Sequence, residues 1–516
     1  MPPTTLPHAA FQAAQHTPHA PALVEDGITY DFAALWAQTR AIATSFMALG
    51  IGPGDVVAIW APNSANWIFA ALGAQICGAA ILPLNTRFRG AEAADLLIRT
   101  RAKALVVTPP FLQTDYLALL EGHELPDLKH LISTGAAQKS ALAWQEFCDL
   151  GAQVPPAAID SALNALTSDH LSDIMFTSGT TGRPKGVMST HSQNIRAFLA
   201  WSDSAGLQAS DRYLIVNPFF HVFGFKAGWL SCLLRGATAY PMPNFDVAQT
   251  AHRIESDNIT FFPGPPTIFQ TLLSGDWHLK HDFSSLRVAV TGAASIPPSL
   301  IARMRDELGF KIVLSGYGLT ESTGVVSMCA AGDSPETVAT TCGHPIPGIE
   351  LKIMMDDGTE APIGEPGEIF IRGFNVMKGY LDDPVATAEA IDAEDWLHTG
   401  DVGVLDEKNY LRITDRKKEM YISGGFNCYP AEIERMLAAH PAIAMVAVIG
   451  VPDERMGEIG RALVVLRPGA TATEQELITW SRETMANYKA PRHFKFIDAL
   501  PINASGKIVR AELKNL

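Results

Sequence analysis

The sequence predicts an α/β protein in three parts: a large N-terminal domain of parallel αβ sheets, a small β-barrel-like piece, and a small α/β C-terminal domain. From about residue 56, short apolar runs alternate with helical periodicity, which is typical of the βαβ units of a parallel sheet. After Gly348 the runs shorten and turn signals separate them, which indicates antiparallel strands. Beyond a charged segment at residues 414–419, strands again flank helical sequence.

The first βαβ unit is predicted at residues 56–60, 66–78 and 80–84. Val-Val-Ala-Ile-Trp at 56–60 is a continuous apolar run, the pattern of a strand buried on both faces. Several of the apolar runs end in Gly or Pro, and ligands of open α/β sheets bind beyond the carboxyl ends of the strands. Further strands of this kind are expected at residues 104–107, 213–217, 260–264, 287–292 and 311–316.

The C-terminal third contains the antiparallel piece and the last domain. Turn signals at residues 356–358 and 363–367 belong to the barrel-like piece, and strands are expected at 442–450 and 461–466. We place the domain boundary in the charged segment. The predicted division is an N-terminal domain at 1–414, a connecting segment at 415–418 and a C-terminal domain at 419–516.

Composition narrows the function. The 516 residues are 47% hydrophobic and 18% charged, with a formal net charge of -15. Nucleic acids and anionic membranes require a basic face, so we expect small-molecule ligands, no nucleic acid and no integral membrane association. The N-terminus lacks the features of a secretory signal, and we expect a cytoplasmic protein. The six cysteines lie far apart, which predicts free thiols.

Residues 177–186 read Thr-Ser-Gly-Thr-Thr-Gly-Arg-Pro-Lys-Gly. The glycines and the proline interrupt every regular period, so the whole stretch is predicted to be an irregular loop after a strand. Hydroxyls and backbone N–H groups suit phosphate oxygens, and the cations neutralise their charge. The stretch is not a Walker loop, because Lys185 is followed by Gly rather than by Ser or Thr. On composition alone, a surface linker is the alternative.

The order of these side chains resembles the phosphate loop of the adenylate-forming (ANL) superfamily, which includes acyl-CoA synthetases, luciferases and peptide-synthetase adenylation domains. Gly-Tyr-Gly-Leu-Thr-Glu at 316–321 and His-Thr-Gly-Asp at 398–401 match later motifs of that family. Asp-Arg-Lys-Lys at 415–418, Ser-Gly-Gly-Phe-Asn at 423–427 and Asn-Ala-Ser-Gly-Lys at 503–507 follow in the family's order. The resemblance implies an AMP-binding domain, a hinge and a mobile C-terminal domain.

The resemblance implies a two-step reaction that uses ATP, Mg²⁺ and coenzyme A. A carboxylate attacks the α-phosphate of ATP to give an acyl-adenylate and pyrophosphate, and a thiol then displaces AMP. Because the first step brings two anions together, catalysis depends on positioning and charge neutralisation. The resemblance assigns nucleotide binding to Thr177, Ser178, Gly179, Thr180, Thr181, Lys185, Gly292, Ala293, Ala294, Ser315, Gly316, Tyr317, Gly318, Thr320, Asp401, Ile413, Arg416 and Lys507.

Particular roles follow from the same resemblance. The implied catalytic residues are Lys507, Glu321, Thr177 and His221, and the implied Mg²⁺ ligands are Thr177 and Glu321. Tyr317 would stack on adenine, and Asp401 with Arg416 would hold the ribose hydroxyls.

Three implied roles concern the C-terminal part of the chain. Lys507 would bridge the substrate carboxylate and the α-phosphate, a task that suits an ammonium with three donors. Lys418 matches the hinge between an adenylating and a thiolating orientation. Ser423, Gly424 and Gly425 would admit the pantetheine arm of coenzyme A.

The acid is predicted to be apolar and bulky. Residues 217–228 form an aromatic-rich turn around His221, and the implied acyl pocket consists of His221, Phe223, Gly264 and Thr267. The stretches at 218–228, 263–270 and 338–343 resemble bacterial CoA ligases of steroid catabolism that activate an indane-dione propanoate. A medium- or long-chain fatty acid is the second candidate, and an aromatic or alicyclic acid is the third.

Two other classes of protein stay open at this point. A carrier-protein-loading or peptide-synthetase adenylation enzyme is the first, although no Asp lies near His221 to hold an amino group. A catalytically inactive binding homologue is the second, and the intact motif residues argue against it. The sequence leaves the oligomeric state open, with a homodimer as one candidate.

Overall fold

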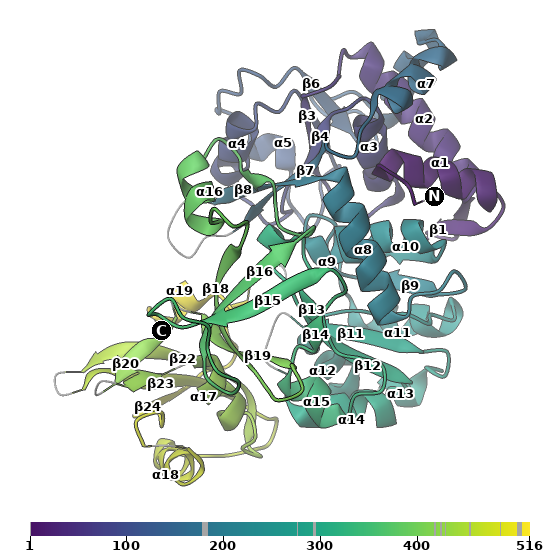
Figure 1. Cartoon of the computed structure of the whole chain (residues 1–516). Coiled ribbons are helices and arrows are strands. Elements are labelled where there is room, and N and C mark those ends of the chain that lie inside the picture. The colour runs from purple at the N-terminus through teal and green to yellow at the C-terminus, as the bar shows by residue number, and fades with distance from the viewer. Residues whose placement is uncertain are drawn as a thin grey trace.

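The computed structural model describes residues 2–177, 184–275, 277–292, 296–416, 419–423, 426–428, 430–453, 456–485, 487–502 and 508–516, with the backbone alone at 415, 416, 422, 426, 427 and 511. Two large sheets and their helices form most of the molecule, an antiparallel sheet lies beside them, and a smaller sheet near the C-terminus lies next to that one (Figure 1). The expected α/β class and its three parts are therefore confirmed.

A seven-stranded sheet contains the predicted phosphate loop. Five of its strands are parallel, and the edge formed by β7, β8 and β17 is antiparallel. The strands expected at 56–60, 80–84 and 104–107 are confirmed as β3, β4 and β5. The spatial order is β17 (Gly379–Tyr380), β8 (Lys185–Thr190), β7 (Leu171–Thr177), β4 (Ala80–Pro83), β3 (Val56–Trp60), β5 (Ala104–Val107) and β6 (His130–Ser133).

Helix α3 (Ala65–Ile76) shows why this layer is so closely packed. All of its residues except Asn66 are buried, and Ser64 caps its first turn by accepting a hydrogen bond from the Trp67 N–H at 3.2 Å. A Cβ on Gly73 would lie 2.6 Å from Cγ2 of Ile42 in α2 (Phe32–Ala48). The glycine therefore lets two apolar helices approach closely behind the sheet.

The second large sheet consists of two four-stranded halves. Its first half, in spatial order, is β2 (Ile28–Asp31), β1 (Pro21–Glu25), β10 (Thr238–Pro241) and β9 (Arg212–Ile215). Its second half is β11 (Val288–Gly292), β12 (Ile312–Tyr317), β13 (Ser327–Met328) and β14 (His344–Pro345).

The strand expected at residues 260–264 is wrong. Only Phe261 is paired there, and its isolated bridges to Tyr213 and Val288 connect the two halves of the sheet. Pro263 and Pro265 have no backbone N–H to give to a ladder, so the apolar run cannot continue as a strand.

Helices cover these sheets and connect their strands (Figure 1). Those of the first half of the chain are α1 (Leu6–His16), α4 (Gly90–Arg99), α5 (Tyr116–Leu119), α6 (Trp144–Leu150), η1 (Gly151–Gln153), α7 (Pro156–Ala165), α8 (His191–Ala205), α9 (Val222–Gly224), η2 (Phe225–Leu230), α10 (Ser231–Arg235) and α11 (Val247–Ser256). Those that follow are α12 (Pro266–Ser274), α13 (Trp277–Lys280), α14 (Pro298–Asp306), η3 (Thr320–Ser322), α15 (Pro335–Thr340) and α16 (Pro384–Ala390).

The antiparallel piece expected after Gly348 is confirmed. Its order is β15 (Ile349–Met354), β16 (Gly367–Gly373), β18 (Leu397–Leu405) and β19 (Leu411–Arg416), and each strand is antiparallel to the next. Gly358 lies in the predicted turn with φ +83°, a conformation that favours glycine. Strand β19 leads directly into the charged segment at 414–419, so the last strand of this piece adjoins the start of the C-terminal part.

The C-terminal part has a hydrophobic core of its own, which includes Leu437, Val448, Val464 and Leu477. Its sheet has the order β21 (Phe426–Cys428), β20 (Tyr421–Ser423), β23 (Gly457–Leu466) and β22 (Ile443–Asp453), and β24 (His493–Phe496) also pairs with β23. The helices are α17 (Pro430–Leu437), α18 (Glu474–Thr484) and α19 (Arg510–Leu513). The exact boundary at 414–419 stays a prediction.

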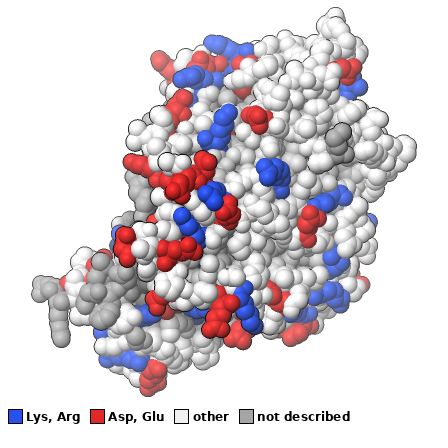
Figure 2. Space-filling model, in the orientation of Figure 1, with Lys and Arg blue, Asp and Glu red and all other residues white. Residues whose placement is uncertain are grey.

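The surface shows mixed charge. On the face drawn in Figure 2, acidic and basic side chains are interspersed rather than gathered by sign. Among the described residues, no helix is long and apolar enough to cross a membrane. The expectation of free thiols is confirmed for all six cysteines, and burial raises the pKa of several of them, including Cys77 to about 12.

Candidate active site

Strands β7 and β8 form a hairpin around the predicted phosphate loop. The prediction that residues 177–186 are wholly irregular is wrong at both ends, because Thr177 pairs with Lys185 and Phe176 pairs with Gly186 in an antiparallel ladder. Backbone hydrogen bonds do not depend on the pattern of side chains, so the ladder continues through these residues. The residues between them, including Ser178, Gly179, Thr180 and Thr181, lie outside the described residues.

A chain of contacts connects this hairpin to Glu321. The ammonium of Lys185 lies 4.8 Å from the centroid of the Tyr380 ring, and the Tyr380 hydroxyl donates a hydrogen bond to Oε1 of Glu321 at 3.0 Å. The Met377 N–H donates to the Glu321 carbonyl at 2.8 Å. The predicted phosphate-binding lysine and the predicted metal-binding carboxylate therefore share Tyr380 as a neighbour.

Tyr380 is a site residue that the sequence motifs did not indicate. It is 9% exposed and lies on β17, which pairs with β8. Burial and the adjacent Glu321 carboxylate raise the pKa of Tyr380, so its hydroxyl remains a donor at physiological pH. The sequence signal was a short Gly-Tyr pair between β16 and α16.

The strand ends of β11 and β12 lie side by side beyond the second sheet. Gly292 pairs with Gly316, and a Cβ on Gly292 would lie 2.7 Å from the Gly316 carbonyl oxygen. A Cβ on Gly318 would lie 2.2 Å from the Gly324 carbonyl oxygen. Small residues are therefore required here. Ser315 precedes this turn on β12, and Ala293 and Ala294 lie outside the described residues.

Tyr317 and Asp401 bring the second sheet and the antiparallel piece together. The Tyr317 hydroxyl donates to Oδ2 of Asp401 at 2.6 Å, and Asp401 is 6% exposed. Asp401 on β18 is paired in register with Arg416 on β19, and Ile413 pairs with Gly403 on the same ladder. These four residues, all predicted to bind the nucleotide, thus come from β12, β18 and β19.

Thr320 and Glu321 lie in the single turn of η3. Thr323, just after this turn, has φ +56°, and its hydroxyl donates to the Asn375 carbonyl at 2.7 Å. The Asn375 amide in turn donates to the Val325 carbonyl at 2.7 Å. These bonds hold the η3 turn against the segment that leads into β17. The orientation of Glu321 therefore depends on this segment as well as on the turn itself.

The predicted acyl side begins at His221, which precedes α9. Nδ1 of His221 accepts a hydrogen bond from the Phe223 N–H at 3.2 Å, and both side chains are partly exposed. A Cβ on Gly324 would lie 2.0 Å from Cγ1 of Val222, so the chain beyond Glu321 packs directly on α9. The structure therefore places the segment of His221 next to that of Glu321.

Apolar groups continue this side of the site. The Trp67 ring lies 5.3 Å from Phe219 and 5.7 Å from Phe225, measured between centroids. The Gly264 N–H donates to the Val290 carbonyl at 3.0 Å, which attaches the predicted pocket residue Gly264 to β11. Thr267 lies in the first turn of α12 and is partly exposed.

A fully buried ion pair joins η2, which follows His221 in the chain, to β7. Nζ of Lys226 in η2 is 2.9 Å from Oδ1 of Asp173 in β7, and both side chains are 0% exposed. The same ammonium donates to the Ser189 hydroxyl of β8 at 3.0 Å, and the Asn194 amide donates to Asp173 at 2.6 Å. Burial lowers the pKa of Lys226, and the Asp173 charge opposes that shift. Sequence reasoning missed this pair.

The predicted residues of the C-terminal part are only partly described. Lys507, Lys418, Gly424 and Gly425 lie outside the described residues. Ser423 ends β20, where it pairs with Phe426 and with Gly457. Two features flank the segment of Lys507: Ile502 pairs with Ile508, and Arg510 forms an ion pair with Glu434 at 2.8 Å.

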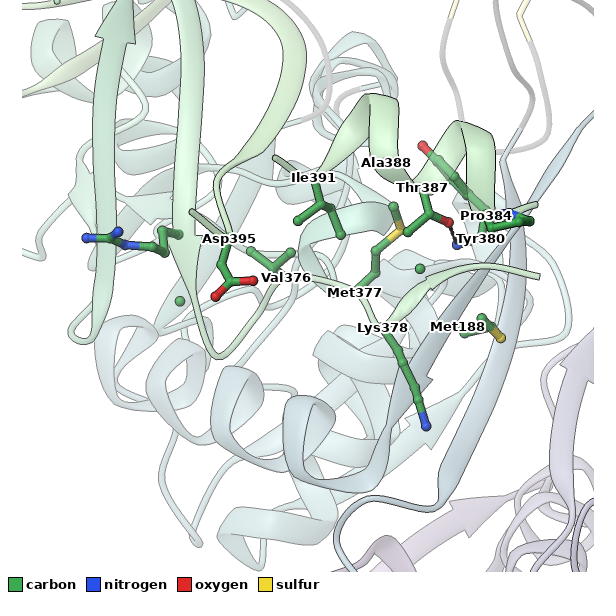
Figure 3. Close-up of a pocket in the computed structure, with 13 residues that line it drawn as sticks. Met188, Val376, Met377, Lys378, Tyr380, Pro384, Thr387, Ala388, Ile391 and Asp395 are labelled. Carbon is green, nitrogen blue, oxygen red and sulfur yellow. Dashed lines mark hydrogen bonds between the residues drawn. The ribbon is translucent and has the colours of Figure 1, made fainter. Parts of the chain in front are cut away.

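A hollow of about 770 Å³ is lined in part by Tyr380 (Figure 3). Its lining comes from β8, the end of β16, β17 and α16, and it includes Met188, Met377, Lys378 and Ile391. None of the predicted site residues lines it. The hollow is therefore a surface feature beside the candidate site rather than the predicted acyl pocket.

Comparison with known proteins agrees with the fold and the motifs. Residues 10–381 match the AMP-binding enzyme family, and residues 432–507 match the AMP-binding enzyme C-terminal domain. A 3-[(3aS,4S,7aS)-7a-methyl-1,5-dioxo-octahydro-1H-inden-4-yl]propanoyl:CoA ligase of Rhodococcus jostii is 47% identical over 99% of this chain and 98% of its own. A ligase of the same name from Mycobacterium tuberculosis is 46% identical over 99% of both chains.

A solved structure, ATP-bound MatB from Rhodopseudomonas palustris, superimposes with a TM-score of 0.89 at 27% identity, over 99% of this chain and 98% of that one. The chain belongs to the AMP-binding enzyme family. Within that family it is an AMP-forming acyl-CoA ligase, which joins a carboxylic acid to coenzyme A through an acyl-adenylate at the expense of ATP.

Proposed function

We propose that this ligase activates a ring-containing, steroid-derived indane-dione propanoate. The observation that carries the proposal is the near full-length identity of 47% and 46% to two ligases named for that acyl group. The aromatic and glycine-lined surroundings of His221 suit a bulky apolar acid, because such pockets are lined mainly by hydrophobic and aromatic side chains. A medium- or long-chain fatty acid is the competing substrate.

The proposed nucleotide site follows the contacts of the described residues. Lys185 and Thr177 flank the loop that would hold the β- and γ-phosphates, and backbone groups of the loop would complete the contact. Tyr317 would carry adenine on its ring while its hydroxyl orients Asp401. Asp401 would accept hydrogen bonds from the ribose hydroxyls. Arg416, its partner in the ladder, would lie on the same side of the nucleotide.

The residues near Glu321 fit Mg²⁺. The carboxylate of Glu321 and the hydroxyl of Thr177 are oxygen donors, and Mg²⁺ is bound by one or two carboxylates together with substrate phosphates. When bound, Mg²⁺ supplies positive charge for the phosphate oxygens. Tyr380 is the positioning residue of this set, because its hydrogen bond fixes one oxygen of Glu321.

Two lysine side chains of the protein would neutralise the remaining negative charge of the phosphates and of the acid carboxylate. Lys185 would contact the phosphates from the hairpin, and Lys507 would contact the acid carboxylate and the α-phosphate together. In the second step Lys507 would withdraw, and the loop of Ser423, Gly424 and Gly425 would admit the pantetheine thiol, with Lys418 as the hinge. His221 would lie where the thiol meets the acyl carbonyl.

A screen of carboxylic acids tests the proposed substrate. Purified protein with MgATP and coenzyme A is given the indane-dione propanoate, octanoate, palmitate or benzoate, and AMP and acyl-CoA are measured. We expect kcat/KM for the indane-dione acid to exceed that for each of the others by at least about 10²-fold, since a bulky pocket loses contacts with smaller acids. A preference for either fatty acid would contradict the proposed substrate and leave the ligase activity intact.

Omitting coenzyme A tests the competing class. A ligase that uses free coenzyme A releases little AMP without it, because the acyl-adenylate remains bound. Equal AMP release with and without coenzyme A would instead favour a carrier-protein-loading enzyme.

A further inference from the structure

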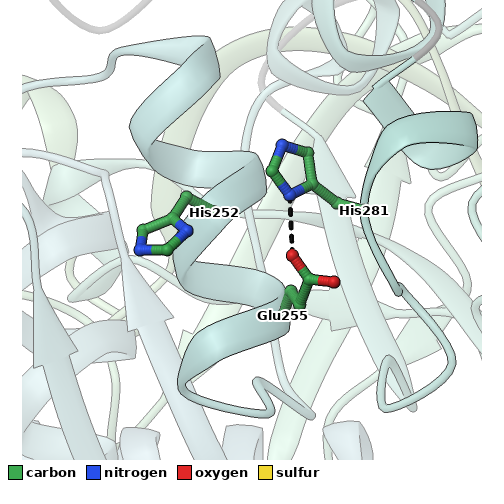
Figure 4. Close-up of side chains that lie close together, drawn as sticks. All are labelled: His252, Glu255 and His281. Atoms are coloured by element: carbon green, nitrogen blue, oxygen red, sulfur yellow. Dashed lines mark hydrogen bonds and ion pairs between the residues drawn. The ribbon is translucent and has the colours of Figure 1, made fainter.

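A cluster of three metal-ligating side chains lies outside the candidate active site. His252 and Glu255 are three residues apart on α11, and His281 follows α13 (Figure 4). One ligand atom of each lies within 4.8 Å of the other two. Residues at i and i+3 share one face of a helix, so His252 and Glu255 lie on the same side of α11. Figure 4 shows Glu255 directed at His281 and the His252 ring to one side of them.

The neighbours of the cluster hold two of the three groups in place. Nδ1 of His281 is 2.8 Å from Oε2 of Glu255, and the Asp282 N–H donates to Oε1 of the same carboxylate at 3.2 Å. The Trp277 ring stacks on the His281 ring with an interplanar angle of 22°. Glu255 and His281 therefore already have a fixed relative orientation, which lowers the entropic cost of binding an ion.

The donor set decides which ion is suitable. Two imidazoles and one carboxylate form the protein ligands of many zinc sites, with Zn–N near 2.0–2.1 Å and Zn–O near 2.0–2.2 Å. Ligand atoms of one tetrahedral ion are then about 3.3 Å apart. The ligand atoms lie within 4.8 Å of one another, so the exposed His252 ring would have to rotate toward the other two groups to bind the same ion. Mg²⁺ prefers oxygen ligands and does not suit this set.

We propose that His252, Glu255 and His281 form a surface site for a first-row transition-metal ion of the Zn²⁺ type. The ion would join α11 to the chain after α13 and so close the segment that contains α12. Its three ligands are not among the predicted active-site residues, and the proposal does not depend on which acid the enzyme uses. A water molecule would complete four-coordination.

Zinc titration of untagged protein tests the site. ZnCl₂ binding is measured by isothermal titration calorimetry for the native protein and for a His252→Ala/His281→Ala variant, with His19→Ala/His123→Ala as the control that removes two exposed histidines elsewhere. We expect the first variant to lose one bound equivalent and the control to keep it. Identical titrations of the native protein and the His252→Ala/His281→Ala variant would overturn the proposal.

Two further measurements separate a built site from surface binding. Glu255→Gln keeps the side-chain size, and we expect it to weaken Zn²⁺ binding about 10- to 100-fold. Co²⁺ bound by two imidazoles and a carboxylate should give a visible absorption band in the native protein and in the histidine control only. Unchanged affinity in Glu255→Gln, or equal binding of MgCl₂ and ZnCl₂ at this site, would count against the proposal.

Discussion

One ion pair in the N-terminal part of the molecule and one in the C-terminal part differ in burial and in the number of contacts that they make. Lys226 of η2 and Asp173 of β7 form the N-terminal pair, and both side chains are 0% exposed. Arg510 and Glu434 lie beside the segment of Lys507, and their side chains are 22% and 7% exposed. Lysine provides one compact charge, whereas the guanidinium contacts both oxygens of Glu434 and reaches Glu419 at 2.6 Å.

The difference shows what each pair can tolerate. A fully buried pair leaves an uncompensated charge when one partner is removed, so the N-terminal pair fixes η2, β7 and β8 relative to one another. The C-terminal pair is partly hydrated and spreads over two carboxylates, so it can lose one contact and keep others. We therefore expect Lys226 to be required for folding, and Arg510 to be required for the alignment of Lys507.

The largest effect is expected for Lys226→Met. The variant leaves Asp173 buried without its cation, and we expect the free energy of unfolding of the N-terminal part to fall by about 3–5 kcal/mol. Urea denaturation followed by tryptophan fluorescence measures it. The double variant Lys226→Met/Asp173→Asn removes both charges and should recover most of the loss. If Lys226→Met were as stable as the native protein, the two pairs would not differ as described.

Lys507→Ala is expected to lower the rate of adenylation about 10²- to 10³-fold, because a donor aimed at developing charge is lost. Thioester formation from pre-made acyl-adenylate should be retained, since the proposed second step does not use Lys507. Pyrophosphate exchange measures the first step, and acyl-CoA formation measures the second. Lys514→Ala, a lysine near the same end of the chain, is the matched control. Equal losses in both steps would contradict the proposed role.

Arg510→Lys keeps the positive charge but removes the guanidinium that contacts both oxygens of Glu434. We expect the C-terminal part to lose about 1.5–3 kcal/mol, the range for hydrogen bonds to charged groups. Adenylation should fall more than thioester formation, because Arg510 anchors the chain three residues after Lys507. Thermal unfolding and the two half-reactions measure these effects. An unchanged ratio of the two rates would show that Arg510 stabilises the fold without aligning Lys507.

In contrast to the two ion pairs, His191 is a buried titratable group that stays neutral in the folded protein. Its Nδ1 accepts from the Leu6 N–H at 3.3 Å, and burial lowers the pKa of His191 to about 3. Below about pH 6.5 the unfolded chain binds a proton that the folded chain does not, so stability falls by about 1.4 kcal/mol per pH unit down to about pH 3. His191→Gln should lose less stability than the native protein between pH 7 and pH 5, and the exposed His19→Gln should not. Equal pH dependence in all three would contradict this assignment.

The sequence predicted the fold and the family well, for a physical reason. Phosphate and ribose recognition needs glycines and hydroxyls in fixed local order, so its motifs lie within single short segments. Tyr380 was not predicted, because its partners Lys185 and Glu321 come from elements far away along the chain. A single lysine inside the apolar run 222–233 was the one signal that could have revealed the pair of Lys226 and Asp173.

The errors of prediction also have local causes. Residues 177, 185 and 186 pair as strands although the side chains show no strand period, and the prolines around residue 264 prevent the strand that the apolar run indicated. The acid itself is the least predictable feature, because an apolar pocket takes its shape from packing between several elements rather than from any one motif.

The bridge between Ile502 and Ile508 has a consequence for how ATP is consumed. Because the residues on either side of segment 503–507 are joined to each other, the two ends of this segment have to move together. In the proposed mechanism, delivery of the Lys507 ammonium would then require the rotation of a whole folded unit. We expect solvent viscosity to slow the formation of the adenylate itself wherever that rotation precedes it.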